Sequence, residues 1–340
     1  MMRAFAIGFG MFVAASAAWC KFPEDFSQPL TVIAIGSCNQ QESPQPMWAR
    51  IDSFGPDLWI WMGDNIYGDT EQMDILSQKY DEQFYKPEYQ VFREKYPIIG
   101  TWDDHDFGVN NGGSWYGPKA ESRDLALKFL EVPADDPRWS REGIYGAYTF
   151  GPEGQQVKIY LLDNRYFATR PHRKDSELIG DAQWAWLREE LRSSTAQINL
   201  IVSGTQILPI DQPFEKWANF PVTRQRFLDF IRDNKIPGVV LASGDRHMQE
   251  ISLKNDQDTQ YPLMEITASG LTHAWGDGAP KEMNRFRVGK LYPYEAFGLL
   301  KISWEGELAT ITAEIVNAKG KIVNSFSLPL AALQPNAYLK

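Results

Sequence analysis

Four short polar segments of this 340-residue chain carry side chains that bind metals, and each follows an apolar run typical of a buried strand. In chain order they are Gly36–Cys38, Gly63–Asp69, Thr101–Gly108 and Ser243–His247. Because ligands bind beyond the carboxyl ends of strands in α/β sheets, we expect the segments to share one crevice. Carboxylates, a thiolate, a phenolate and an imidazole together form a suitable ligand set for a metal cluster.

The segment Gly63–Asp69 is the most informative of the four. Its Asp64 and Tyr67 are three residues apart, directly after a predicted strand, and the two glycines allow a tight loop. A carboxylate can bridge two metals, and a tyrosinate beside it favours a trivalent ion such as iron(III). The alternative is a polar turn with Tyr67 packed into the core.

Three aspartates surround a histidine in the segment Thr101–Gly108. Side-chain alternation cannot direct all four groups into one pocket. We therefore expect Asp104 to be a metal ligand and His105 to face the substrate. Either Asp103 or Asp106 would then orient the imidazole. The alternative is an acidic turn around a hydrogen-bonded histidine.

Two further strand ends combine aspartate with a basic side chain. Asp245 and His247 are two residues apart, so one loop can direct both inward. Arg165 follows another predicted strand. It would either bind a phosphate group through two hydrogen bonds or pair with Asp163.

Alternating strands and helices predict an α/β (α+β) protein with two packed mixed β-sheets flanked by helices. The expected strands of its first part are Leu30–Gly36, Leu58–Met62, Ile98–Trp102, Tyr145–Phe150, Val157–Leu162, Ile198–Ser203 and Val239–Ala242. Helices are expected at Asp181–Arg192, with Asp181 as the N-cap, and at Pro221–Asn234.

The C-terminal part predicts three consecutive strands that extend one sheet. They are Phe297–Trp304, Leu308–Val316 and Lys321–Leu328, with a hairpin turn at Asn317–Gly320. No Pro/Gly-rich linker divides the chain, so we expect a single domain over residues 21–340. The net charge of −10 and the lack of a basic stripe argue against a nucleic-acid-binding role.

Residues 1–18 have the pattern of a cleaved secretory signal peptide, with a basic start and a short apolar stretch that ends in small residues. No later segment resembles a transmembrane helix, so we expect a periplasmic or secreted protein. The alternative is a lipoprotein anchored at Cys20, although Trp19 fits a lipobox poorly. A disulfide between Cys20 and Cys38 is the alternative to metal ligation by Cys38.

The motifs together resemble the alkaline phosphatase D (PhoD-like) family, within the calcineurin-like and purple-acid-phosphatase superfamily. The matching segments are GSCNQ (36–40), GDNIYGD (63–69), WDDHDFG (102–108), LDNRY (162–166), SGTQ (203–206) and SGDRH (243–247). The resemblance implies the calcineurin-like sandwich as the fold. It implies iron(III) as one metal, held by Cys38, Asp64, Tyr67 and His247. Asp64 would bridge to calcium, which Asp104 and Asp245 complete, and His105 would be the catalytic histidine.

The function implied by this resemblance is that of a secreted metal-dependent phosphoesterase, a phosphoric ester hydrolase acting on phosphomonoesters, phosphodiesters or both. A metal-bound hydroxide would attack a small phosphate-ester substrate, and Arg165 would help to neutralise the phosphoryl charge. A dedicated phosphodiesterase of the phospholipase D-like type, with the same fold, is one alternative. A metal-free serine hydrolase is disfavoured because no Gly-x-Ser-x-Gly motif occurs.

An alternative of another class is a non-catalytic calcium- or carbohydrate-binding protein of the cell surface. Its support is the acidic balance and the aromatic pairs Trp115–Tyr116 and Tyr292–Tyr294, which would serve as sugar platforms. The other interpretation of these aromatics is that they form core and pocket walls. A phosphoesterase assay with added calcium separates an enzyme from a binding protein.

Overall fold

The computed structural model describes residues 22–256 and 258–335. The predicted signal peptide at residues 1–18 lies outside the described residues. So does Cys20, at which a lipid anchor and a disulfide were the alternatives. Within the described residues, no helix is long and apolar enough to cross a membrane.

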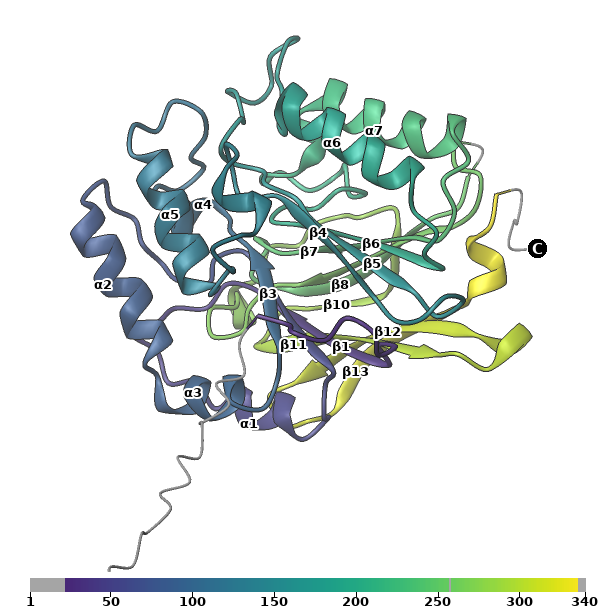
Figure 1. Ribbon diagram of the computed structural model, residues 1–340, viewed down its shortest axis with the longest axis horizontal. Helices are drawn as coiled ribbons and strands as arrows, with labels where there is room; N and C mark the ends of the chain where they lie inside the picture. The colour runs from purple at the N-terminus through teal and green to yellow at the C-terminus, as the bar shows by residue number, and fades with distance from the viewer. Residues whose placement is uncertain (1–21, 257, 336–340) are drawn as a thin grey trace, which may run out of the picture.

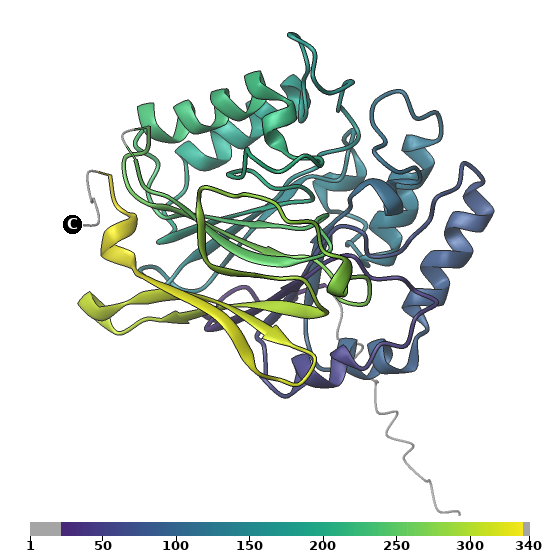
Figure 2. The same cartoon turned by 180° about the vertical axis from the view of Figure 1, so that it is seen from behind.

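A six-stranded mixed sheet forms one half of the fold, in the order β13-β12-β11-β1-β2-β3 (Figure 1). Its strands are β1 (Val32–Gly36), β2 (Leu58–Met62), β3 (Ile98–Thr101), β11 (Ala296–Ser303), β12 (Thr310–Asn317) and β13 (Ile322–Pro329). Strands β1, β2 and β3 are parallel, whereas β11, β12 and β13 form the antiparallel meander seen from behind in Figure 2.

A seven-stranded mixed sheet forms the other half, in the order β10-β8-β9-β7-β6-β5-β4. Its strands are β4 (Gly146–Phe150), β5 (Val157–Leu161), β6 (Ile198–Ser203), β7 (Val239–Ser243), β8 (Gln249–Lys254), β9 (Leu263–Ala268) and β10 (Arg287–Tyr292). Strands β5, β6, β7 and β9 are parallel neighbours. They are almost wholly buried and apolar, as expected for parallel strands covered on both faces.

Helices cover the outer faces of the two sheets (Figure 1). They are α1 (Met47–Asp52), α2 (Met73–Phe84), α3 (Pro87–Arg93), α4 (Asp104–Phe107), α5 (Lys119–Phe129), α6 (Gly180–Arg192) and α7 (Pro221–Asp233). Trp48 of α1 packs edge-on against Trp59 and Trp61, which project from the same face of β2. Helices α6 and α7 lie side by side on the opposite side of the molecule, joined by an edge-on contact between Trp184 and Phe230. The predicted fold class is confirmed.

Three strands, β8, β9 and β10, were not identified from the sequence. Strand β10 is only partly buried, and in β8 the apolar pattern is interrupted by buried polar residues, among them Gln249 and Glu250. Both side chains are satisfied in the structure: the amide of Gln249 bonds the backbone of Ser269, and the Glu250 carboxylate pairs with Arg287 at 2.6 Å. The N-cap prediction for Asp181 is wrong, because α6 begins at Gly180 and Asp181 lies within its first turn.

Candidate metal centre

The loops that follow the parallel strands of both sheets meet at one edge of the sandwich. Backbone hydrogen bonds join them across the two sheets. After β9, the N–H of Gly270 donates to the carbonyl of Ser37 (3.1 Å), and that of His273 donates to the carbonyl of Cys38 (3.2 Å). The four segments that the sequence analysis expected in one crevice also lie together, because Cys38, Asp104, Asp245 and His247 each place a potential ligand atom within 4.8 Å of one on Asp64.

Glycines at two of these strand ends permit the close approach of neighbouring loops. A Cβ on Gly63, which has a φ of +95°, would lie 2.7 Å from the backbone nitrogen of Asp103. A Cβ on Gly244 would lie 2.6 Å from Oγ of Ser37, in the other sheet. Only glycine leaves room for these contacts, which bring the loop of β2 against that of β3 and the loop of β7 against that of β1.

Four of the six predicted metal ligands have a left-handed backbone. The φ angles are 55° at Cys38, 48° at Asp64, 69° at Asp245 and 53° at His247. This conformation costs an L-residue on the order of 1 kcal/mol or more, and such strain concentrates at functional sites. This strained backbone occurs at four positions on three separate strand ends. We infer that the strain is tolerated because it orients these side chains into the crevice.

The potential ligand atoms form three overlapping groups, and within each group all atoms lie within 4.8 Å of one another. The groups are Cys38 with Asp64 and His247; Asp64 with Asp104 and His105; and Asp64 with Asp103, Asp104 and Asp245. Asp64 belongs to all three. It therefore occupies the position that a bridging ligand between two metals would need.

The phenol oxygen of Tyr67 lies between two imidazoles, 3.1 Å from Nε2 of His247 and 2.9 Å from Nδ1 of His273. Burial raises the pKa of Tyr67 well above its usual value, and the neighbouring Cys38 and Asp64 raise it further. The free phenol consequently keeps its proton. A highly charged cation beside Asp64 is what would ionise it.

The thiol and imidazole of this group have the burial expected of ligands. Cys38 is fully buried, with Sγ 3.2 Å from a carboxylate oxygen of Asp64 and 3.0 Å from Oγ of Ser269. Burial raises the pKa of the Cys38 thiol to about 11. Burial, together with the nearby His273 and His105, lowers the pKa of His247 to about 3. His247 is thus neutral at ordinary pH, which is the form that binds metals.

The all-oxygen side of the cluster is formed by Asp64, Asp104 and Asp245. The carboxylate of Asp104 accepts hydrogen bonds from the backbone N–H groups of Asn111 (2.6 Å) and His105 (3.0 Å). Burial, aided by the charge of Asp104, raises the pKa of Asp245 to about 7. Burial also raises the pKa of Asp64 well above its usual value. A bound cation would offset both the burial of these carboxylates and the repulsion between their charges. Hard carboxylate oxygens are the ligands that calcium prefers.

Asp103, a member of the third group, is compatible with a nearby cation. Its Oδ2 is buried and has no hydrogen-bond partner among the described residues. Unpaired buried polar atoms are rare in folded proteins. Together with the shared position of Asp64 and the strained backbones, this shows that the residues fit a two-metal centre with sulfur, nitrogen and oxygen ligands on one side and oxygen ligands on the other.

The partner that orients His105 is Asp69, whose carboxylate lies 2.7 Å from Nδ1 of the imidazole. The expectation that Asp103 or Asp106 would do so is wrong. Asp103 pairs with Arg165, and the Asp106 carboxylate accepts the backbone N–H of Asp103 because α4 begins between them. Burial is the largest single effect on the pKa of His105 and lowers it. The hydrogen bond to Asp69 and the charges of Asp104, Asp69 and Asp245 together outweigh burial, so the pKa is raised.

Arg165 is buried, and its guanidinium contacts two carboxylates. Nε lies 2.6 Å from Asp103 and Nη2 lies 2.6 Å from Glu215. The alternative of a side-chain pair between Arg165 and Asp163 is wrong, since the Asp163 carboxylate instead accepts the backbone N–H of Arg165. Binding of a phosphoryl group by Arg165 stays a prediction.

Four residues of the site were not identified from the sequence: Asp69, Glu215, Ser269 and His273. His273 follows β9, a strand that was itself overlooked, although the apolar run from Leu263 was a usable signal. Glu215 lies in an irregular segment that has no periodic pattern. In both cases the side chain reaches the site through packing of distant segments.

The aromatic pairs considered as sugar platforms pack against neighbouring side chains or meet each other edge-on. Tyr116 is buried against Phe107, with ring centres 5.0 Å apart, so it cannot form a platform. The guanidinium of Arg170 lies 3.9 Å from the ring centre of Trp115. Tyr292 and Tyr294 meet edge-on, at an interplanar angle of 62°. None of these arrangements presents a flat, paired surface.

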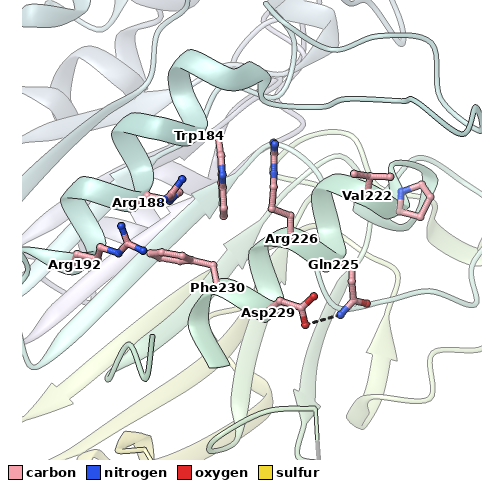
Figure 3. Close-up of a pocket in the computed structure, with 9 residues that line it drawn as sticks. Trp184, Arg188, Arg192, Val222, Gln225, Arg226, Asp229 and Phe230 are labelled. Carbon is pink, nitrogen blue, oxygen red and sulfur yellow. Dashed lines mark hydrogen bonds between the residues drawn. The ribbon is translucent and has the colours of Figure 1, made fainter. Parts of the chain in front are cut away.

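A large open cavity of about 750 Å³ lies away from this cluster, between α6 and α7 (Figure 3). Arginines stack on its aromatic lining, and the guanidinium of Arg226 lies 4.7 Å from the ring centre of Trp184. None of the candidate metal ligands lines this cavity. The cavity is therefore separate from the cluster at the strand ends.

Comparison with known proteins gives a consistent result for the sequence. The sequence profile of the PhoD-like phosphatase family matches residues 33–293. Alkaline phosphatase D of Bacillus subtilis (strain 168) is 23% identical over 297 residues, which are 73% of this chain and 48% of that protein. The chain thus spans about half the length of this relative.

Solved structures with the same fold include that of PhoD, with a TM-score of 0.74 and 16% identity over 94% of this chain and 74% of that chain. A purple acid phosphatase from seeds of yellow lupin (Lupinus luteus) has a TM-score of 0.64 and 14% identity, covering 91% of this chain and 55% of that chain. At these identities the likeness shows a shared fold, and it supports the predicted sandwich.

Proposed function

Because the chain belongs to the PhoD-like phosphatase family, we propose that it is a metal-dependent phosphoric ester hydrolase. The observation that carries the proposal is the place of Asp64 in all three groups of potential ligands. When bound, two metals at this position would polarise phosphoryl oxygens and supply a hydroxide nucleophile. The pattern of residues 1–18 supports export of the mature protein.

The first metal site would hold iron(III) through Cys38, Asp64, Tyr67 and His247. A thiol, a phenol and a neutral imidazole that converge on one carboxylate support this choice, since phenolate favours a trivalent ion. The second site would hold calcium through Asp64, Asp104 and Asp245. Its support is a ligand set made of carboxylate oxygens alone.

His105 would act directly on the substrate, by stabilising the transition state or by protonating the leaving oxygen. Asp69 occupies its Nδ1, which leaves Nε2 as the ring atom available to a substrate. Arg165 would contribute through its positive charge beside the carboxylates. Because its guanidinium is already paired with Asp103 and Glu215, its influence on the phosphoryl group would be electrostatic.

Calcium-dependent hydrolysis is the expected result when the purified protein is assayed at alkaline pH with an aryl phosphate monoester. Exhaustive chelation that leaves iron in place should abolish turnover, and added calcium should restore it, because Asp104 and Asp245 bind their cation through oxygen alone. Full turnover after such chelation would contradict the calcium assignment. Calcium binding without turnover of any ester would favour the non-catalytic alternative.

The same assay with an alkyl aryl diester separates the two enzymatic alternatives. We propose activity on diesters beside monoesters. A monoester preference in kcat/KM beyond about a thousandfold, roughly 4 kcal/mol in transition-state binding, would identify a dedicated monoesterase. A diester preference of that size would identify the dedicated phosphodiesterase.

Replacement of Tyr67 by phenylalanine is expected to abolish the visible charge-transfer band of a tyrosinate–iron(III) pair. The reason is that the phenol oxygen beside His247 supplies the ligand. Absorption spectra and iron content of the pure proteins measure the effect. Tyr261→Phe is the matched control, because its buried phenol donates to the Ile236 carbonyl at 2.6 Å, outside the metal centre. An unchanged band in Tyr67→Phe, or an active native protein without iron, would show the assignment to be wrong.

A further inference from the structure

The indole ring of Trp275 is exposed at the rim of the metal centre. Its exposed fraction is 37%, whereas Trp48, Trp59, Trp61, Trp102 and Trp217 are fully buried. The ring centre lies 5.7 Å from that of His247, a predicted metal ligand. A large apolar ring left in contact with water beside reactive groups is a candidate contact for a ligand.

Two hydrogen bonds hold Trp275 in place relative to the predicted ligands. Its indole N–H donates to the carbonyl of Arg246, and its backbone N–H donates to the carbonyl of His247, each at 2.9 Å. Both acceptors belong to the loop that also carries Asp245. The ring is therefore preorganised, so ligand binding would lose little conformational entropy through ordering of this side chain.

Phe214 extends this aromatic surface from a different part of the chain. Its ring centre lies 5.7 Å from that of Trp275, at an interplanar angle of 43°. The Arg246 guanidinium lies 4.4 Å from the centre of the Phe214 ring, and two bonds of 2.7 Å to Glu282 hold it there. The next residue, Glu215, pairs with Arg165, which ties Phe214 to the metal centre.

We propose that Trp275 and Phe214 form a binding subsite for a planar aromatic group on the alcohol side of the ester. The proposal rests on the proposed phosphoesterase function and names the class of substrate that the site prefers. The tilted pair of rings offers faces and edges against which another aromatic ring can stack. A small aliphatic alcohol covers little of this surface and gains correspondingly little from it.

The test compares an aryl with an alkyl monoester in the native protein and in Trp275→Ala. We expect kcat/KM for 4-nitrophenyl phosphate to fall about tenfold in the variant, while kcat/KM for ethyl phosphate changes less than about threefold. Phe214→Ala should also lower kcat/KM for the aryl ester more than kcat/KM for the alkyl ester. Calorimetry with phenylphosphonate and methylphosphonate measures binding without hydrolysis. The same variants should lose affinity for phenylphosphonate but not for methylphosphonate.

Two control variants separate stacking from support of the metal loop. Trp275→Phe keeps an aromatic face without the indole N–H, so it should retain most of the aryl preference. Trp304→Ala removes a partly exposed tryptophan whose indole N–H also donates to a carbonyl at 2.9 Å, that of Leu30 at the amino end of β1. This variant should leave kcat/KM for both the aryl and the alkyl ester unchanged.

Equal losses for aryl and alkyl esters in Trp275→Ala would overturn the subsite and show that the ring only supports His247. An unchanged ratio of phenylphosphonate to methylphosphonate affinity would overturn it as well. Failure of the proposed function looks different. A native protein that hydrolyses neither ester contradicts the phosphoesterase, and the phosphonate affinities then still decide whether the aromatic subsite exists.

Discussion

Replacement of Asp64 by alanine is expected to remove both metals and to lower kcat/KM by about 10³-fold or more, since metals supply several kcal/mol of transition-state stabilisation. The reason is structural. Asp64 is the one residue common to every group of potential ligand atoms within the described residues. Its carboxylate lies 3.2 Å from the Cys38 sulfur and also faces Asp104 and Asp245. Metal analysis and kinetics of the purified variant measure the two effects.

Asp57→Asn is the matched control for this experiment. Asp57 precedes β2, whereas Asp64 follows it, so the two aspartates lie at opposite ends of one strand. The Asp57 carboxylate accepts backbone hydrogen bonds from Thr31 and Val32, and asparagine keeps an acceptor there. The control should retain metals and activity. An Asp64→Ala protein that folds normally by circular dichroism and still binds both metals would contradict the bridging role.

Replacement of His105 by alanine is expected to lower kcat by roughly 10²–10⁴-fold, the usual contribution of a positioned acid or base, while metal content stays close to that of the native protein. Asp69→Asn should give a smaller loss in the same direction, because Asp69 holds Nδ1 of the imidazole at 2.7 Å. Single-turnover kinetics and metal analysis of both variants provide the measurement.

The alternative role of His105 is that of a metal ligand, because its ring nitrogen lies in one group with Asp64 and Asp104. Loss of metal in step with loss of activity in His105→Ala would establish that role and exclude the catalytic one. His172→Ala serves as the control. His172 is exposed and lies outside all three groups, so its replacement should change neither quantity.

The positions of the predicted metal ligands follow from how the two sheets are joined. Cys38 and Asp64 come from the six-stranded sheet, whereas Asp245 and His247 come from the seven-stranded sheet. A site of this kind forms only when both sheets are packed, so metal binding should be linked to the stability of the whole sandwich. The packing of the two sheets brings Cys38 and His247, more than 200 positions apart in the chain, into one group of potential ligands.

Local sequence was sufficient for many of the strands and for a hypothesis about the type of chemistry. The apolar runs of β2 and β6 predict strands whose bounds agree with the structure, because a buried parallel strand needs a short, continuous apolar segment. The spacing of Asp64 and Tyr67 also indicates a metal site without tertiary information, since both residues lie in one tight loop. Residue type and short-range spacing are properties that a sequence displays directly.

The tertiary structure alone decided which distant groups meet. His105 takes Asp69 as its partner, Arg165 takes Asp103 and Glu215, and His273 reaches the phenol of Tyr67 from another sheet. Each of these contacts depends on the register of strands and on the path of irregular loops. Hydrophobic periodicity reports which face of an element is buried, but it contains no information about which polar side chain of another element will lie against it.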